Sequence, residues 1–258
     1  YIPEWQRLEG CERMYRGDHW HDVPITDRNE PRPVTPIIQS TVENIQADLM
    51  DRIPEAVIAP ERPEDEPVAK VIEAIIRQNH DAYCYAKEYR RIVHDMLVGG
   101  YAIQEVGYDP ALNGGLGGAF IRQVDNRSIL FDPLASDMPD SRAAVKTSLR
   151  TREYIETHYP DKAPFLTQDA YGKPDAVEDE VLRGDRTEAM LLMEYWWKEY
   201  DPETDMDRIH MAQLAGNTVL TDSRDFKPEG YFDHGMYPFI LTPLFTRKGS
   251  CLGLGLVD

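Results

Sequence analysis

A long helical pattern from Pro67 to Val98 constrains the fold of this chain more than any other stretch. Apolar or neutral residues recur there with a 3.6-residue period, which places them on one face of a helix and predicts that this face is buried. These residues are Val68, Ile72, Ile75, Ile76, Ala82, Tyr83, Ala86, Val93 and Leu97. Proline suits the first turn of a helix, and the pair Gly99-Gly100 is typical of its end. We therefore predict one continuous helix whose buried residues include Ile72, Ile75, Ile76 and Val93.

Strand-like runs follow this helix. Residues 101–108 and 119–124 alternate like strands, and they flank a loop at 109–118 that is rich in glycine. A third run, residues 128–131, ends at Asp132-Pro133. We predict that residues 101–131 form an antiparallel meander with an exposed 109–118 loop. Long helices packed on an antiparallel meander make an α+β fold.

Weaker patterns flank this core. We expect an amphipathic helix near the N-terminus and a second helix at 37–53, with a possible strand at 56–59. Residues 144–149 read as a strand, Thr151 can cap a short helix, and a minor helix is possible at 174–182. The run 189–200 is apolar on both faces, which predicts a central strand. A hairpin is predicted to turn at Gly216-Asn217, and Pro238 and Pro243 confine the strand at 237–246 to an edge.

Composition excludes several classes of protein. The chain has 258 residues and a formal net charge of −18, which argues against a general nucleic-acid-binding surface, because such a surface needs lysine and arginine to displace counterions. Its 3 cysteines are widely spaced without a CxxC pair, so we expect neither a zinc site nor a disulfide framework. We expect no transmembrane helix and no signal peptide, and the missing initial Met indicates a piece of a longer polypeptide.

Two stretches carry candidate chemistry. Asp18, His19, His21 and Asp22 are of ligand types that suit zinc or manganese, so a metal-dependent hydrolase or nuclease is one alternative. Closely spaced ligands in a loop form only half a site, and no HExxH partner is present, so we favour a solvated turn beside a buried Trp20. The pair Trp196-Trp197 suits base stacking, but we favour core packing there. We predict no catalytic residue, cofactor or metal ligand.

A series of short segments occurs in a specific order along nearly the whole chain. They are Tyr15-x-Gly17-Asp18-x-Trp20, Arg32-Pro33 and the helix that ends near Arg52-Ile53-Pro54, Gly99-Gly100-Tyr101, Val124-Asp125 with Ile129-Leu130-Phe131-Asp132-Pro133, Ser141-Arg-Ala-Ala with the run to Tyr159-Pro160, Glu194-Tyr195-Trp196, Tyr237-Pro238-Phe239 and Gly249–Asp258. Together they resemble the N-terminal part of portal proteins from podovirus-type tailed bacteriophages and prophages.

The resemblance implies a structural protein without catalytic residues. Portal proteins form twelve-fold rings at one capsid vertex, through which DNA is packaged and ejected. The implied partners are further copies of the chain, the terminase large subunit, a tail adaptor or head completion protein, the capsid protein, and DNA that passes without sequence-specific binding. The implied location is the portal vertex of the virion, with the host cytoplasm during assembly. An acidic channel would repel phosphates and let DNA slide.

The resemblance also implies a division of the chain. Residues 1–200 correspond to an α+β wing-like body, 201–248 to a small β-rich, clip-like lobe, and 249–258 to the start of a stem helix that continues beyond Asp258. The chain departs from the family pattern between Tyr200 and Met206, where little of a first stem helix is present. A generic α+β module that binds an acidic-surface partner remains a further alternative.

Overall fold

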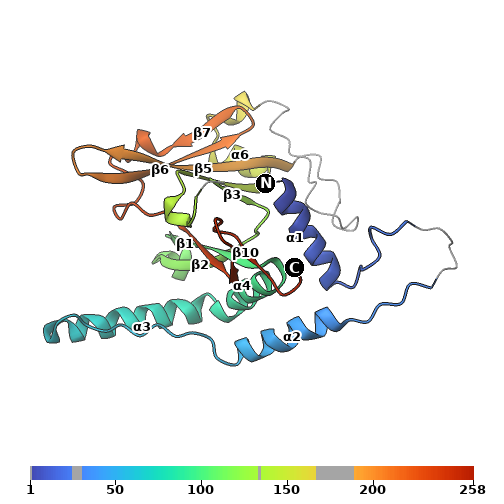
Figure 1. Cartoon of the computed structure of the whole chain (residues 1–258). Helices are drawn as coiled ribbons and strands as arrows, with labels where there is room; N and C mark the ends of the chain where they lie inside the picture. The colour runs from blue at the N-terminus through green and yellow to red at the C-terminus, as the bar shows by residue number, and fades with distance from the viewer. Residues whose placement is uncertain (1, 25–30, 133–134, 167–188) are drawn as a thin grey trace. The chain divides into compact units, whose positions relative to one another are not determined.

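Figure 1 shows the chain as a computed structural model, which describes residues 2–24, 31–132, 135–166 and 189–258. The chain divides into two compact units, residues 1–127 with 238–258, and residues 128–237. Each unit contains helices and an antiparallel sheet, so the predicted α+β class is confirmed. The expected lobes, divided at residues 200 and 248, stay a prediction. The compact units divide the chain elsewhere, because the strands on either side of residue 201 form one hairpin.

Helix α4 is the centre of the first unit. The helices of this unit are α1 (Ile2–Tyr15), α2 (Ile37–Met50), α3 (Glu66–Ala82) and α4 (Tyr85–Gly99). Val93, Leu97 and Val98 of α4 are buried in one cluster with Cys11 of α1 and Val42 of α2. The other side of α4 contacts the sheet through strands β1 and β2. Burial of Val93 is therefore confirmed.

The predicted single helix at 67–98 is wrong, because it is broken at Tyr83-Cys84. The Tyr83 N–H donates to the carbonyl of Asn79, and Cys84 then takes a left-handed conformation with φ 49°. His80 and Tyr85 stack across the break with their ring centroids 4.2 Å apart. No glycine or proline marks this break, so the sequence pattern runs through it unchanged.

The predicted burial of Ile72 and Ile75 is also wrong. Both side chains are exposed, whereas Ile76 is half-buried. A 3.6-residue period shows which residues share a face of a helix, but it does not show what covers that face. Here the apolar stripe of α3 is left uncovered by the described part of the chain.

The sheet of the first unit has the order β2-β1-β8. Strand β1 (Tyr101–Asp109) pairs with β2 (Gly118–Val124) through the expected exposed loop, and with β8 (Phe239–Pro243) on its other side. The edge position of β8 agrees with Pro243 at its end and Pro238 directly before it. A short hairpin, β9 (Phe245–Thr246) with β10 (Gly253–Leu254), follows it. The predicted strand at 56–59 is absent, because residues 56–59 form no helix or strand.

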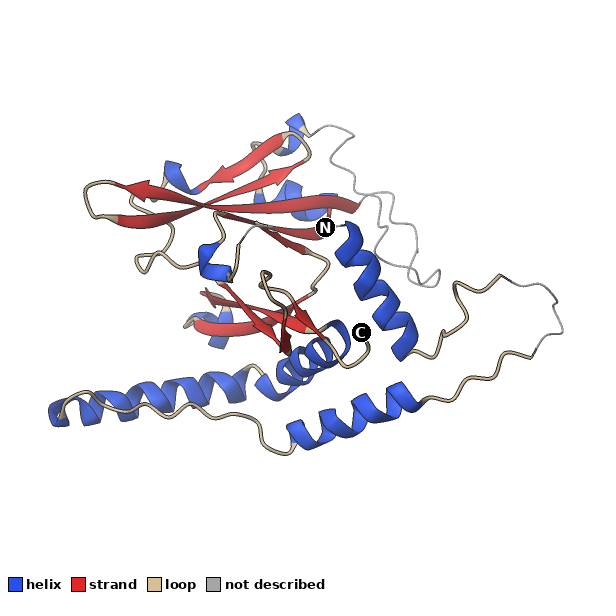
Figure 2. Cartoon of the chain, in the orientation of Figure 1, coloured by secondary structure: helices blue, strands red, loops and turns tan. Residues whose placement is uncertain are grey.

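The second unit contains a five-stranded antiparallel sheet of order β3-β4-β5-β6-β7. Its strands are β3 (Ile129–Phe131), β4 (Ala143–Thr151), β5 (Ala189–Asp201), β6 (Met206–Ala215) and β7 (Thr218–Asp222). The central position of β5 and the β6–β7 hairpin are confirmed. The predicted three-stranded meander is wrong at its third strand, because β3 pairs with β4 and not with β2. Figure 2 shows helix α6 (Arg152–His158), which Thr151 caps as expected.

The C-terminal residues pack on the end of α4 without forming a helix. The Leu256 N–H donates to the carbonyl of Leu97 at 2.8 Å, and the Asp258 carboxylate contacts Arg7 of α1. Residues 249–258 therefore contain β10 and turns in place of the expected helix start. The possible helix at 174–182 lies outside the described residues.

The exposure of Ile75 leads to a first prediction. We expect Ile75→Asp to fold with a free energy of unfolding within about 0.5 kcal/mol of the parent chain, because the new charge stays in water. Val93→Asp should prevent folding, because it buries an unpaired charge between α4, α1 and α2. Urea denaturation followed by circular dichroism measures both variants. Equal loss of structure in the two variants would contradict the assignment of these faces.

The turn after α4 leads to a second prediction. Gly100 has φ 89°, and a Cβ there would lie 2.6 Å from the backbone nitrogen of Gly255. Gly100→Ala should therefore destabilise the chain by about 2 kcal/mol or more, from the left-handed backbone and the clash together. Gly10→Ala in α1 is the matched control, since nothing lies within 4 Å of its added Cβ. Thermal unfolding of both variants is the measurement, and an unchanged midpoint for Gly100→Ala would count against this packing.

Candidate functional site

The histidines and aspartates at 18–22 do not converge on a common point. The ring Nε2 of His19 donates to the carbonyl of Met14 at 3.1 Å, and Nδ1 of His21 donates to the carbonyl of Asp18 at 2.9 Å. The other ring nitrogen of His21 lies 2.9 Å from the Asp22 carboxylate. Among the described residues, no three His, Cys, Asp or Glu side chains are placed to share a metal ion. The geometry thus gives the metal-hydrolase alternative no support.

The same segment instead makes a structural contact. Trp20 is half-buried, not buried as expected, and its indole N–H donates to the carbonyl of Pro33 at 3.2 Å. The Arg32 guanidinium lies 5.6 Å from the centre of the Trp20 ring and donates to the carbonyl of Val23. Two motif segments that are separate in the sequence are therefore joined in space.

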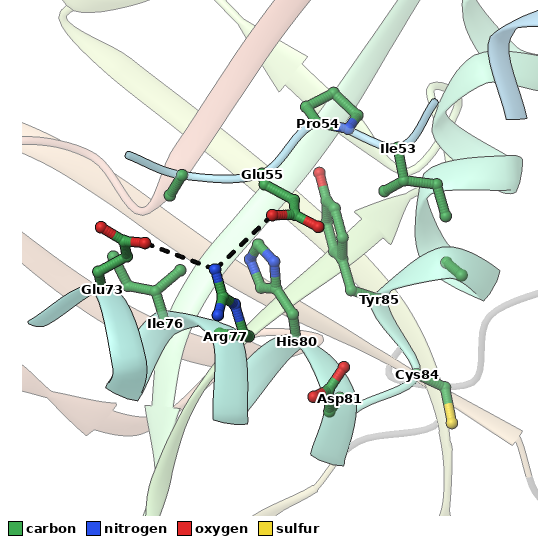
Figure 3. A pocket seen from close by; sticks show the side chains of 12 residues that line it. Ile53, Pro54, Glu55, Glu73, Ile76, Arg77, His80, Asp81, Cys84 and Tyr85 are labelled. Atoms are coloured by element: carbon green, nitrogen blue, oxygen red, sulfur yellow. Dashed lines mark hydrogen bonds and ion pairs between the residues drawn. The ribbon is translucent and has the colours of Figure 1, made fainter. Parts of the chain in front are cut away.

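A pocket of about 390 Å³ lies between residues 53–56, α3 and the start of α4 (Figure 3). Figure 3 shows Arg77 between two carboxylates, with Glu73 at 3.5 Å and Glu55 at 3.7 Å. His80 and Tyr85 line the pocket beside this group, with their rings stacked. Because the arginine pairs with both carboxylates, this arrangement fits a contact that holds residues 53–56 against one face of α3.

A second pocket, of about 280 Å³, lies between α1, α4 and β2 and is more polar. Asp95 of α4 accepts a hydrogen bond from the side chain of Gln123, and burial raises the pKa of Asp95 to about 7. Next to it, the Glu12 carboxylate lies 3.9 Å from the His94 ring. This pairing raises the pKa of His94 and lowers the pKa of Glu12.

Sequence reasoning missed this polar group, because the helical pattern at 67–98 was read from its apolar residues alone, and His94 and Asp95 are not among them. Its residues belong to three elements that meet only in the fold. The arrangement can take up a proton near neutral pH, since the pKa of Asp95 lies in that range. We therefore assign it an effect on the pH dependence of packing between α1, α4 and β2.

The aromatic pair on β5 is divided between the two faces of its strand. Trp196 is buried against Tyr231 and Phe232, which confirms core packing for this residue. Trp197 is half-buried and stacks on Tyr195, with the Arg224 guanidinium 5.3 Å from its ring centre. The arginine in turn pairs with Asp222 at 2.7 Å. Neighbouring residues in a strand point to opposite faces, so the two rings cannot form one stacking platform.

Comparison with known proteins adds one family match. The family model described as phage P22-like portal protein matches residues 3–235 of the chain. A search of the curated proteins finds no match. Within the described ranges, the helices are too short or too polar to span a bilayer.

The buried carboxyl leads to a third prediction. The folded pKa of Asp95, about 7, lies above its ordinary value of 3.8, so the fold favours the neutral acid. The free energy of unfolding should therefore fall as the pH rises from about 4 to about 7. Asp95→Asn cannot ionise, keeps an acceptor for Gln123, and should be more stable than the parent by about 1–2 kcal/mol at pH 8, with little difference at pH 4.

Chemical denaturation across this pH range measures the effect. Asp48→Asn on α2 is the control, because Asp48 is exposed and the same substitution there leaves the buried group around Asp95 intact. A parent and an Asp95→Asn variant with parallel pH profiles would contradict the buried-carboxyl assignment.

Proposed function

Because the chain belongs to the phage P22-like portal protein family, we propose that it is a subunit of the ring that forms the DNA channel at one vertex of a phage or prophage capsid. The family is structural and not enzymatic, and its members form rings. The single observation that carries the proposal is the family match over residues 3–235, which spans most of both compact units.

The finer parts of the proposal follow the family. We propose that DNA passes through the ring during packaging and ejection, and that the terminase large subunit, the tail adaptor or head completion protein and the capsid protein contact it. Residues 201–248 are the proposed clip-like lobe that meets terminase first and the tail adaptor later. Assembly is proposed to take place in the host cytoplasm, with the finished ring in the virion.

The charge of the chain supports a channel that does not hold DNA. The chain has 46 acidic and 28 basic residues, and its net charge of −18 opposes phosphate binding, which provides most of non-specific DNA affinity. DNA driven by a separate motor moves more easily along walls that do not bind it tightly. The same charge has a cost for assembly, because like-charged copies around one axis repel each other at low ionic strength.

The repulsion between like-charged copies leads to a fourth prediction. A ring is built from heterologous contacts, in which one face of each copy meets a different face of the next copy, and stable joints need extensive contact. We expect the chain to be monomeric or weakly associated when dilute at low salt, and to form larger species as salt and protein concentration rise. Light scattering gives the mass, and negative-stain electron microscopy shows whether the larger species are closed rings.

Two outcomes would oppose the proposal. The proposed ring would be contradicted if the chain stays monomeric at high salt and high concentration, and also does so when the stem helices of the family are added. A stable dimer under all conditions would favour the alternative of a generic binding module.

A further inference from the structure

Helix α3 carries an apolar stripe that the described part of the chain leaves uncovered. Val68, Val71, Ile72 and Ile75 follow the spacing i, i+3, i+4 and i+7, and their exposed fractions are 59%, 57%, 42% and 52%. This spacing puts all four side chains on one side of a helix. A contiguous apolar stripe on a surface helix marks a contact with another protein surface more often than a solvated face.

The stripe is separate from the face of α3 that is covered within the chain. Residues 53–56 cover the side that carries Glu73, Ile76 and Arg77, where Arg77 pairs with Glu55 (Figure 3). Figure 1 shows α3 running away from α4 and from the sheet of its own unit toward the N-terminal end of the helix. The stripe therefore lies on an arm and not over the core of the unit.

The N-terminal end of this arm is acidic. Glu61, Glu64, Asp65 and Glu66 are all exposed and directly precede the stripe, with Arg62 as the only cation among them. In the described part of the chain, Glu61, Glu64 and Asp65 form no ion pair, whereas Glu66 pairs with Lys70 at 2.8 Å. We call the acidic residues and the stripe together the α3 surface. A partner that fits it must offer apolar contact beside cations.

The chain has such a surface of its own on the β9–β10 hairpin. Residues 238–257 contain Arg247 and Lys248 and no acidic residue, although the chain as a whole carries a net charge of −18. Both cations are exposed at the tip of the hairpin, and within the described residues neither forms an ion pair. Beside them Phe245 and Leu254, which are direct partners in the hairpin register, are 53% and 37% exposed. We call these four residues the hairpin surface.

We propose that the α3 surface of one copy docks on the hairpin surface of a second copy of this chain. This inference rests on the proposed ring, and it names the two faces that meet at each joint. The two surfaces are different, so the contact is heterologous and repeats from copy to copy, as a ring requires. Within one copy they do not meet, since Figure 1 places the acidic end of α3 at the outer end of the arm and β10 beside α4.

A zero-length cross-link tests this contact directly. A carbodiimide joins an amine to a carboxylate only when the two groups touch, so it should couple Lys248 to Glu64, Asp65 or Glu66. When ¹⁴N-labelled and ¹⁵N-labelled chains are mixed before the reaction, a cross-link between two copies gives peptide pairs of mixed isotope. Mass spectrometry should find mixed pairs at this position. Assembled chain without such pairs would overturn the inference.

Charge reversal provides a second test, with a rescue built into it. Arg247→Glu with Lys248→Glu should weaken association by about tenfold or more, and Glu64→Lys with Asp65→Lys should do the same, because each change sets like charges against each other. All four changes in one chain should restore association, since every joint then carries the reversed pair. Light scattering measures association, and circular dichroism checks that each variant is folded.

Matched controls separate the joint from general surface effects. Lys87→Glu with Arg90→Glu reverses two exposed charges on α4 and should leave association unchanged. Ile75→Asp should weaken association, whereas Leu116→Asp should not, although Leu116 is 86% exposed in the 109–118 loop. Failure of the four-fold variant to recover would overturn the pairing of these two faces.

The two levels of the proposal can fail separately. If the parent chain forms rings and the variants of both surfaces form them equally well, the proposed function is supported and the proposed contact between the α3 surface and the hairpin surface is contradicted. If the parent forms no larger species under any condition, the proposed function fails as well.

Discussion

The first compact unit depends on the way its chain turns at the end of α4. Three separate segments hydrogen-bond to this one place: Arg7 of α1 donates to the carbonyl of Gly99 at 2.7 Å, Leu244 to that of Gly100, and Leu256 to that of Leu97. Gly100 itself donates back to the carbonyl of Met96. Carbonyls at the end of a helix lack intrahelical partners, so they are available to these donors. Only glycine leaves room for the C-terminal segment at position 100. The Gly99-Gly100 pair is thus a junction as well as a helix end.

The sequence predicts those elements whose identity depends on local pattern. Strand β5 is apolar on both faces and is central, the β6–β7 hairpin turns at Gly216-Asn217, and Thr151 caps α6. It fails where the outcome depends on distant residues. No glycine or proline in the sequence predicts the break at Cys84. The pairing of β3 with β4 in place of β2 depends on strand β4, which lies farther along the chain. The polar group around Asp95 is unpredictable for the same reason, since α1, α4 and β2 each provide part of it.

The family relation and the net charge of the chain both agree with a subunit that does not bind DNA tightly. A subunit of the proposed DNA channel would have to expose surfaces that bind copies of itself and to avoid binding the DNA that passes. The high negative charge favours the second requirement and opposes the first. In the proposed joint, local patches would reduce this conflict, because charges in contact lie within a Debye length of each other, whereas most acidic residues of two neighbouring copies lie farther apart and are screened by salt.

The left-handed residue between α3 and α4 has a mechanical consequence. A continuous helix transmits bending along its whole length, whereas a break at Cys84 concentrates the bend at one residue. Helix α3, which carries the exposed stripe, therefore joins α4 through this single break, and the stacked rings of His80 and Tyr85 span the break. A change of the backbone angles at Cys84 alone would alter the angle between the two helices, since the break already interrupts their hydrogen bonding. In the proposed ring, the angle at this residue would therefore affect how neighbouring copies are oriented.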